Sequence, residues 1–165
     1  MDSEKQRIES KIATAFADVT LGDGVSLHET VVIDNYGTDA ERAAARVDDE
    51  HEDWQKLVSD PDFATIRWIG GFSFYDAEGL RFHLPAYLTL AVRDFECERC
   101  GDVLEGLMFA LTSTSEYNRD RFSILTPAQR SCVREVLVYL RRTYELESTE
   151  LDQAILNHWC IDEAR

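Results

Sequence analysis

Apolar and polar residues alternate from Phe72 to Leu84, where the chain shows its clearest period of two. Within this stretch, Asp76-Ala-Glu-Gly79 is typical of a type I turn, with Asp at the first position and Gly at the last. Because such a turn joins antiparallel strands, the pattern predicts a β-hairpin over residues 72–84. In this register one face is apolar (Phe72, Phe74, Phe82, Leu84), and the other pairs Tyr75 with Arg81 and Ser73 with His83.

Helical spacing governs most of the remaining chain. Apolar residues recur every three to four positions in residues 3–19, 38–58, 85–95, 102–111, 126–144 and 148–159. The segment 26–36 is a short helix or, because it contains three consecutive β-branched residues, a strand. We therefore predict an α+β fold, predominantly α-helical, with about six helices packed around the β-hairpin of residues 72–84.

Several helix starts have their own local signals. Thr126 is a candidate N-cap, followed by proline at the first helical position and by Gln129. Further capping boxes are predicted at Ser26-x-x-Glu29, Thr38-x-x-Glu41 and Ser3-x-x-Gln6. Pro85 should end the second strand of the hairpin and begin the next helix.

The chain is strongly acidic. Its 165 residues include 32 Asp and Glu against 17 Lys and Arg, for a formal net charge of −15. This charge disfavours binding to nucleic acids and anionic membranes, and it favours a protein partner with a basic surface. The length suits one globular domain, residues 1–165. No apolar run reaches membrane-spanning length and no signal-peptide pattern opens the chain, so we expect a cytoplasmic protein.

The segment Phe74-x-Asp76-x-Glu78-Gly79-x-Arg81-Phe82-x-Leu84-Pro85-Ala86-Tyr87 resembles a signature of an uncharacterised bacterial family of small proteins. The similarity extends to residues 12–19, 45–54 and 122–129, so it covers most of the chain. The family is a domain of unknown function. The resemblance therefore implies a shared fold and a bacterial cytosolic setting, and it supplies no activity and no functional residues.

The Cys97-x-x-Cys100 motif is one candidate for metal chemistry. Zinc requires four ligands, and the other cysteines and histidines are distant in the sequence. No predicted strand precedes the motif, as a thioredoxin-like redox site would require. We predict reduced thiols with no metal and no cofactor, and a structural zinc held by Cys97 and Cys100 is the alternative.

The densest acidic run is Asp48-Asp-Glu-His-Glu-Asp53, which falls on the predicted helix of residues 38–58. On a helix, Asp49 and Asp53 share a face, as do Asp48 and Glu52. We predict that Asp48, Asp49, Glu52 and Asp53 bind the basic partner. The alternative is a metal-dependent or hydrolase-like enzyme that uses His51 with Asp49 and Asp53. No second helix carries the matching Glu-x-x-His of a di-metal bundle.

The face of the predicted hairpin that carries Tyr75, Arg81 and His83 is a candidate pocket lining. The chain contains no nucleophile elbow and no glycine-rich phosphate loop. We therefore predict a non-enzymatic protein-binding module, in its concrete form an immunity- or antitoxin-like inhibitor of a basic partner. An enzyme built on the acidic helix is the alternative, and a nucleic-acid mimic is a third hypothesis.

Overall fold

The computed structural model describes residues 2–61, 63 and 70–160, and every regular element in those ranges is helical. The predicted α+β class is therefore wrong. No strand occurs among the described residues, and the stretch 72–84 forms two helical segments instead of a β-hairpin.

Ten α-helices follow one another along the described chain. They are α1 (Asp2–Ala15), α2 (Leu27–Asp34), α3 (Asp39–Arg46), α4 (Trp54–Leu57), α5 (Gly70–Phe74), α6 (Ala77–Arg93), α7 (Gly101–Thr112), α8 (Glu116–Phe122), α9 (Pro127–Thr143) and α10 (Thr149–Gln153). A 3-10 turn, η1 (Glu98–Cys100), precedes α7, and a π-helical turn, η2 (Ala154–His158), continues α10. Within the described residues, none of these helices combines the length and the apolar character needed to cross a membrane.

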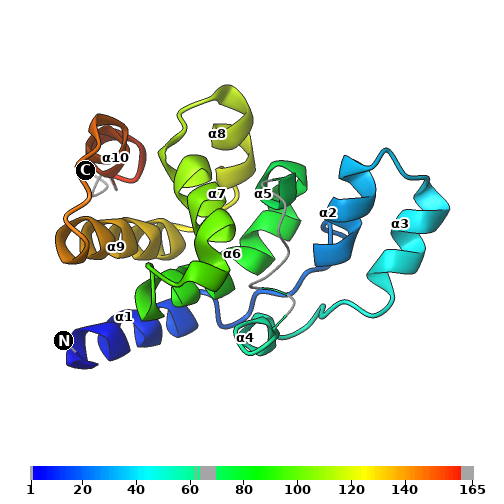
Figure 1. Ribbon diagram of the computed structural model, residues 1–165, viewed down its shortest axis with the longest axis horizontal. Coiled ribbons are helices and arrows are strands. Elements are labelled where there is room, and N and C mark those ends of the chain that lie inside the picture. Colours follow the sequence, from blue (N-terminus) through cyan, green and yellow to red (C-terminus); the bar gives the residue numbers. More distant parts are fainter. Residues whose placement is uncertain (1, 62, 64–69, 161–165) are drawn as a thin grey trace.

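Helix α6 lies at the centre of the molecule (Figure 1). Helices α1, α4, α7, α8 and α9 all pack against it. At one end of the molecule α10 lies above the end of α9 in the view of Figure 1, and at the opposite end α2 and α3 form a helical pair. Helix α3 packs against α2 and buries none of its own residues.

The segment predicted to be a hairpin is the junction between α5 and α6. Asp76, the predicted first residue of the turn, is the N-cap of α6, and its Oδ1 accepts a hydrogen bond from the backbone N–H of Gly79 at 2.8 Å. The N–H of Leu80 bonds to the carbonyl of Asp76 at 2.9 Å and continues the chain into the helix. A type I turn and the first turn of a helix have closely similar backbone angles, so the same four residues are compatible with both.

Helix α6 is buried on almost every side, and this hides its helical period. Twelve of its 17 residues are buried. A helix that is covered all round carries no amphipathic stripe, so the alternation around Phe82 and Leu84 arises by coincidence. Of the predicted apolar face, Phe72, Phe82 and Leu84 are in the core, and Phe74 is only partly buried.

Pro85 lies inside α6, although we predicted that it would separate a strand from a helix. A proline cannot donate the backbone hydrogen bond to the carbonyl four residues earlier, here that of Arg81. The neighbouring side chains of Leu84, Ala86 and Leu88 are completely buried. This burial of apolar surface offsets the missing hydrogen bond and keeps the helix continuous.

The capping signals predicted the starts of helices more accurately than the hydrophobic pattern predicted the type of element. At α9 the N–H of Gln129 bonds to Thr126 Oγ1 at 3.2 Å, and the N–H of Thr126 bonds to Gln129 Oε1 at 3.0 Å. The same reciprocal pair, Thr38 and Glu41, caps α3. The ambiguous segment 26–36 contains the helix α2. Only the predicted cap at Ser3 is wrong, because α1 already begins at Asp2.

A buried carboxylate joins α2 to α3. Glu29, which is 6% exposed, accepts hydrogen bonds from the N–H of Ser26 at 2.8 Å and from Arg46 at 2.9 Å, and Arg42 lies at 3.5 Å. Burial raises the pKa of Glu29, but the hydrogen bonds from Ser26 and Arg46 outweigh it and bring the pKa below its ordinary value. Arg46 also donates to the carbonyl of Gly22 at 2.5 Å. Charged groups therefore hold a helix that has no buried residues of its own.

The predicted helix of residues 38–58 is interrupted. Helix α3 ends at Arg46 and α4 begins only at Trp54. Between them, Glu50 Oε1 accepts a hydrogen bond from the N–H of Asp53 at 3.1 Å, and the carboxylate of Asp53 caps α4. Side chains that bond to nearby backbone N–H groups compete with helical hydrogen bonds, so this acidic run forms a loop.

The loop before α2 touches the first turn of α6 through two glycines. The N–H of Val25 bonds to Asp76 Oδ1 at 3.0 Å. A Cβ atom on Gly79 would overlap the carbonyl oxygen of Val25 and lie 2.9 Å from Asp76 Oδ1, and a Cβ on Gly24 would lie 2.8 Å from the carbonyl carbon of Glu78. The two backbones are thus in direct contact, with no room for a side chain.

The burial of Phe82 gives a first prediction. Phe82 is completely buried at the centre of the molecule, so Phe82→Ala should lower the free energy of unfolding by about 3–5 kcal/mol. Phe109→Ala is the matched control, because the Phe109 side chain is 70% exposed. Urea denaturation followed by circular dichroism measures both. Equal stability of the two variants would contradict the position of Phe82 in the core.

The glycine contact gives a second prediction. In a helix, Gly→Ala ordinarily stabilises by about 1 kcal/mol, but at Gly79 the new methyl group would meet the backbone of Val25. We expect Gly79→Ala to destabilise by about 1–3 kcal/mol. Gly101→Ala, at the start of α7, meets no atom within 4 Å and should be neutral or stabilising. A stabilised Gly79→Ala protein, measured by the same denaturation, would refute the contact.

Candidate functional site

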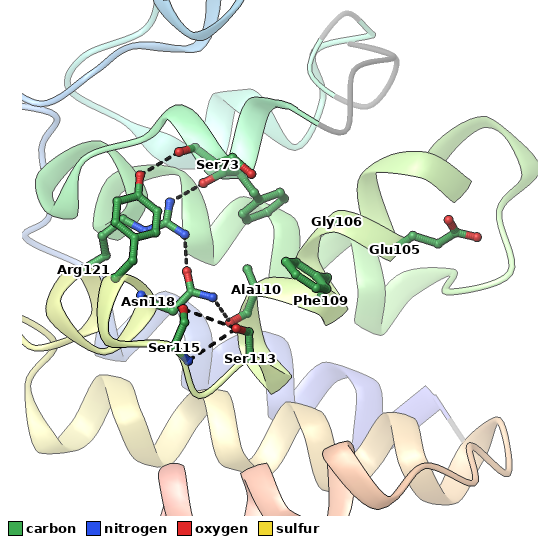
Figure 2. A pocket seen from close by; sticks show the side chains of 11 residues that line it. Ser73, Glu105, Gly106, Phe109, Ala110, Ser113, Ser115, Asn118 and Arg121 are labelled. Atoms are coloured by element: carbon green, nitrogen blue, oxygen red, sulfur yellow. Dashed lines mark hydrogen bonds between the residues drawn. The ribbon is translucent and has the colours of Figure 1, made fainter. Parts of the chain in front are cut away.

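A cavity of about 490 Å³ opens between α5, α7 and α8 (Figure 2). We call it the Arg121 cavity. Its apolar walls are formed by Phe72, Gly106, Phe109 and Ala110. Its polar groups are Ser73, Ser113, Ser115, Tyr117, Asn118 and Arg121, and Glu105 also lines it. A mostly apolar cavity of this size with a few convergent polar groups is typical of a small-molecule site.

Arg121 is the charged group of this cavity, and only 7% of it is exposed. Its Nη1 donates hydrogen bonds to the carbonyls of Phe72 and, at 3.1 Å, of Tyr75, and its Nη2 donates to Asn118 Oδ1. The two carbonyls lie at the C-terminal end of α5. Arg121 thereby satisfies carbonyl groups that the end of a helix leaves without partners, and it links α8 to the junction of α5 and α6.

Among the described residues, no carboxylate forms an ion pair with Arg121. Its guanidinium carbon instead lies 4.4 Å from the centre of the Tyr117 ring, and Tyr117 donates a hydrogen bond to the carbonyl of Ser73 at 2.7 Å. Burial lowers the pKa of Arg121 below its ordinary value. Its Nε is buried and has no hydrogen-bond partner, so this cation is compensated by neutral groups alone.

The polar groups of the cavity lie along one wall. Figure 2 shows Arg121, Asn118, Ser115 and Ser113 in sequence beside Ala110. Asn118 Nδ2 donates to the carbonyl of Ala110 at 3.4 Å, and its backbone N–H donates to Ser115 Oγ at 3.3 Å. Figure 2 also shows Glu105 beyond Phe109, with its carboxylate turned away from Arg121. The arrangement places a positive charge at one end of the cavity and apolar surface at the other.

A second hollow of about 500 Å³ lies between α7 and α10, and we call it the α7–α10 groove. Leu104 and Leu151, which are 2% and 1% exposed, belong to its lining, together with the partly buried Met108 and Leu146. Phe109 lines both this groove and the Arg121 cavity. Methionine and exposed aromatic side chains are common on surfaces that bind other proteins.

Four exposed carboxylates surround the α7–α10 groove. They are Glu96, Glu98, Glu105 and Glu147. Among the side chains that line the groove in the described part of the chain, none is basic. The groove therefore combines an apolar floor with a negative rim, and it is electrostatically complementary to a basic apolar ligand.

The structure separates the four predicted partner-binding acids. Asp49 accepts a hydrogen bond from the N–H of His28 at 3.0 Å and lies 2.5 Å from His28 Nδ1, and its side chain is only 4% exposed. Asp53 caps α4. Asp48 and Glu52 are exposed. Two of the four carboxylates thus already have internal partners, and the role of this segment in binding stays a prediction.

The alternative metal or hydrolase site around His51 is not assembled. His51 Nε2 lies 3.0 Å from the carbonyl of Arg46, whereas Asp49 bonds to His28 and Asp53 bonds to the backbone of Gln55. Within the described ranges, no group of three or more His, Cys, Asp or Glu side chains is placed to hold a metal ion. The Sγ atoms of Cys97 and Cys100 lie 3.2 Å apart, and no further ligand from the described residues completes a zinc site there.

Of the predicted pocket residues Tyr75, Arg81 and His83, the structure buries Tyr75 and His83. Tyr75 is completely buried, and its ring stacks on that of His83 with centroids 4.4 Å apart. Arg81 is partly buried. Neither the Arg121 cavity nor the α7–α10 groove is lined by any of the three. Tyr75 lies in the short junction between α5 and α6, and its ring meets His83 on α6 without any pairing of strands.

His83 is neutral in this environment. It is 1% exposed, and its Nδ1 lies 2.7 Å from the carbonyl of Gly79 and therefore carries the ring proton. Burial lowers its pKa to about 4, although the Gly79 carbonyl and the negative charges of Asp49 and Asp76 favour protonation. Burial also raises the pKa of the neighbouring Tyr75 well above its ordinary value. The stacked Tyr75 and His83 are therefore both uncharged and are held together by packing.

Sequence reasoning missed Arg121 and Phe109. No local feature distinguishes the buried Arg121 from the exposed Arg119 two positions earlier. Phe109 had a detectable signal, because it falls outside the apolar stripe of the predicted helix of residues 102–111, next to Met108. A large aromatic residue off the apolar stripe of a helix is expected to be exposed.

The low pKa of His83 gives a third prediction. An unfolded histidine binds a proton below about pH 6.5, but folded His83 resists protonation down to about pH 4. Stability contributed by neutral His83 is therefore complete above pH 6.5 and lost as pH falls toward 4, by roughly 3 kcal/mol in total. His83→Phe, which keeps the stacked ring, should remove this loss. The free energies of unfolding of the wild type and of His83→Phe, measured by denaturation from pH 7 to 4.5, should therefore diverge as the pH falls. A constant difference between them would contradict the prediction. Burial also lowers the pKa of His158. The contributions of His158 and of the other titrating groups to the pH dependence are the same in both proteins and cancel in the comparison.

Comparison with known proteins identifies a family. No curated protein and no solved structure matches the chain. One family model, described as a family of unknown function (DUF6714), matches residues 4–163. The expected membership in an uncharacterised family is thereby confirmed. Because the match extends over nearly the whole sequence, this chain belongs to DUF6714, a family of unknown function.

Proposed function

We propose that this protein binds another protein, and that the α7–α10 groove receives a basic amphipathic helix of that partner. The observation that carries the proposal is the combination of an apolar groove with four exposed glutamates and no basic side chain among its described lining residues. In its concrete form the protein is an immunity- or antitoxin-like inhibitor that covers a basic effector.

The apolar lining of the groove suits one face of a helix. A helix that binds in a groove inserts apolar side chains at positions i, i+3, i+4 and i+7. Met108, Leu146 and the exposed Phe109 offer apolar surface for such residues. Lysines or arginines on the flanks of the incoming helix would then lie near Glu96 and Glu147.

The charge of the whole molecule supports the same class of partner. A net charge of −15 attracts a basic protein over a distance comparable to the Debye length, about 10 Å at 0.1 M salt, and raises the rate of association. Apolar contacts in the groove would then slow dissociation. The groove would thus determine which partner binds, and the overall charge would determine how fast the two proteins meet.

A synthetic helix of leucine and lysine, about five turns long and carrying a fluorophore, tests this proposal by fluorescence anisotropy. We expect binding that weakens as salt rises, and no binding of the same peptide with glutamate in place of lysine. A lysine peptide with the same composition in scrambled order, which lacks an apolar face, should bind at least about tenfold more weakly because the groove contacts are lost.

Two charge-matched double variants locate the contact. Glu96→Lys with Glu147→Lys changes the rim of the groove, and Asp48→Lys with Glu52→Lys makes the same change of charge in the acidic loop. We expect the first pair to weaken binding about tenfold more than the second. The reverse order would move the partner site to the acidic loop, and equal effects would show that only net charge matters.

A further inference from the structure

The Arg121 cavity has features that neither the fold nor a protein-binding role requires. Arg121 holds the carbonyls at the end of α5, but this role does not require an open hollow of about 490 Å³ beside the buried cation. The cavity opens to solvent beside the exposed Phe109 and Tyr117, and such hollows with apolar walls and a few convergent polar groups are where small molecules bind. The cavity is therefore a candidate site for a small ligand.

The guanidinium retains donors that nothing in the described chain uses. Of its five N–H groups, three are used by the carbonyls of Phe72 and Tyr75 and by Asn118 Oδ1. Nε has no partner, and Nη2 has a second N–H. Because Nε is itself buried, the second N–H of Nη2 is the donor that remains for a ligand, and a hydrogen bond between a guanidinium and a carboxylate is stronger than one between neutral groups.

We propose that the Arg121 cavity binds a small organic acid with one carboxylate and an apolar body. The carboxylate lies at the Arg121 end, near Asn118 and the hydroxyl groups of Ser113 and Ser115 (Figure 2). The apolar body lies between the rings of Phe72 and Phe109. One buried cation without an ion-pair partner balances one negative charge, so a monocarboxylate fits better than a dianion such as a phosphate ester.

The position of Glu105 is consistent with this assignment. Among the described residues, Glu105 is the one carboxylate that lines the cavity, and Figure 2 shows it beyond Phe109, directed away from Arg121. Its charge is exposed and screened by solvent. It therefore leaves the Arg121 end positive while it lies near the open, apolar end. This proposal does not depend on the α7–α10 groove or on a protein partner.

Isothermal titration calorimetry with defined probes tests the proposal on the intact protein. The probes are 3-phenylpropionate, indole-3-acetate and octanoate, each beside its neutral primary amide. We expect at least one acid to bind and to bind at least about tenfold more tightly than its amide, because a hydrogen bond to an ionised group is stronger than one to a neutral group. Absence of binding by all three acids, or equal affinity of acids and amides, would overturn the proposal.

Neighbouring substitutions on α7 and its C-cap separate the cavity from the groove without disturbing the structural role of Arg121. Ser113→Leu fills the cavity, whereas Thr112→Leu makes a similar change at a residue that lines only the groove. We expect Ser113→Leu to reduce the affinity for the acid at least about tenfold and Thr112→Leu to leave it unchanged. Arg121→Lys keeps the charge but replaces the planar guanidinium by a compact ammonium with a different donor geometry, so in a folded variant it should reduce the preference for acid over amide. Loss of binding in Thr112→Leu alone would place the acid in the groove and overturn the proposal.

Discussion

The burial of helix α6 on almost every side is the constraint on which the rest of this structure depends. Helices α1, α4, α7, α8 and α9 pack around it, and its apolar side chains form the middle of the hydrophobic core. Its start is fixed by Asp76, whose carboxylate accepts hydrogen bonds both from the helix and from the N–H of Val25. The loop before α2 is thereby tied to the same point, so one side chain sets the beginning of α6 and the position of the α2–α3 pair.

Two arginines at the edges of this core, Arg46 and Arg121, differ in how their charge is balanced. Arg46 meets the buried carboxylate of Glu29, and the pair holds α3 to α2. Arg121 meets only carbonyl and amide oxygens, a tyrosine ring and a cavity. A buried charge without a counter-ion costs more free energy than one in a pair. This difference makes the surroundings of Arg46 a structural joint and those of Arg121 a place where an anion would be stabilised.

Helix α7 connects the two hollows described above. One side of it lines the Arg121 cavity and another lines the groove beside α10, with Phe109 and Glu105 shared between them. The two sites suit ligands of opposite charge, because the cavity presents a buried cation and the groove presents exposed carboxylates. Two different surfaces of one helix therefore support two independent proposals about what this acidic protein binds.

The sequence by itself determined features that depend on a few neighbouring residues. The caps at Thr38 and Thr126 were predictable because hydrogen bonds within one turn hold them, and so was the negative charge. Tertiary structure decided the remainder. Burial on all sides removed the amphipathic period of α6 and left an alternation around Phe82 that is also compatible with a hairpin. The acidic run became a loop that distant residues hold, because Asp49 bonds to His28 and the carbonyl of His51 accepts a hydrogen bond from the N–H of Leu21. Arg121 became a candidate site only because α8 packs against the end of α5, more than forty residues earlier in the chain. Burial of a polar side chain by such distant segments leaves no local pattern in the sequence.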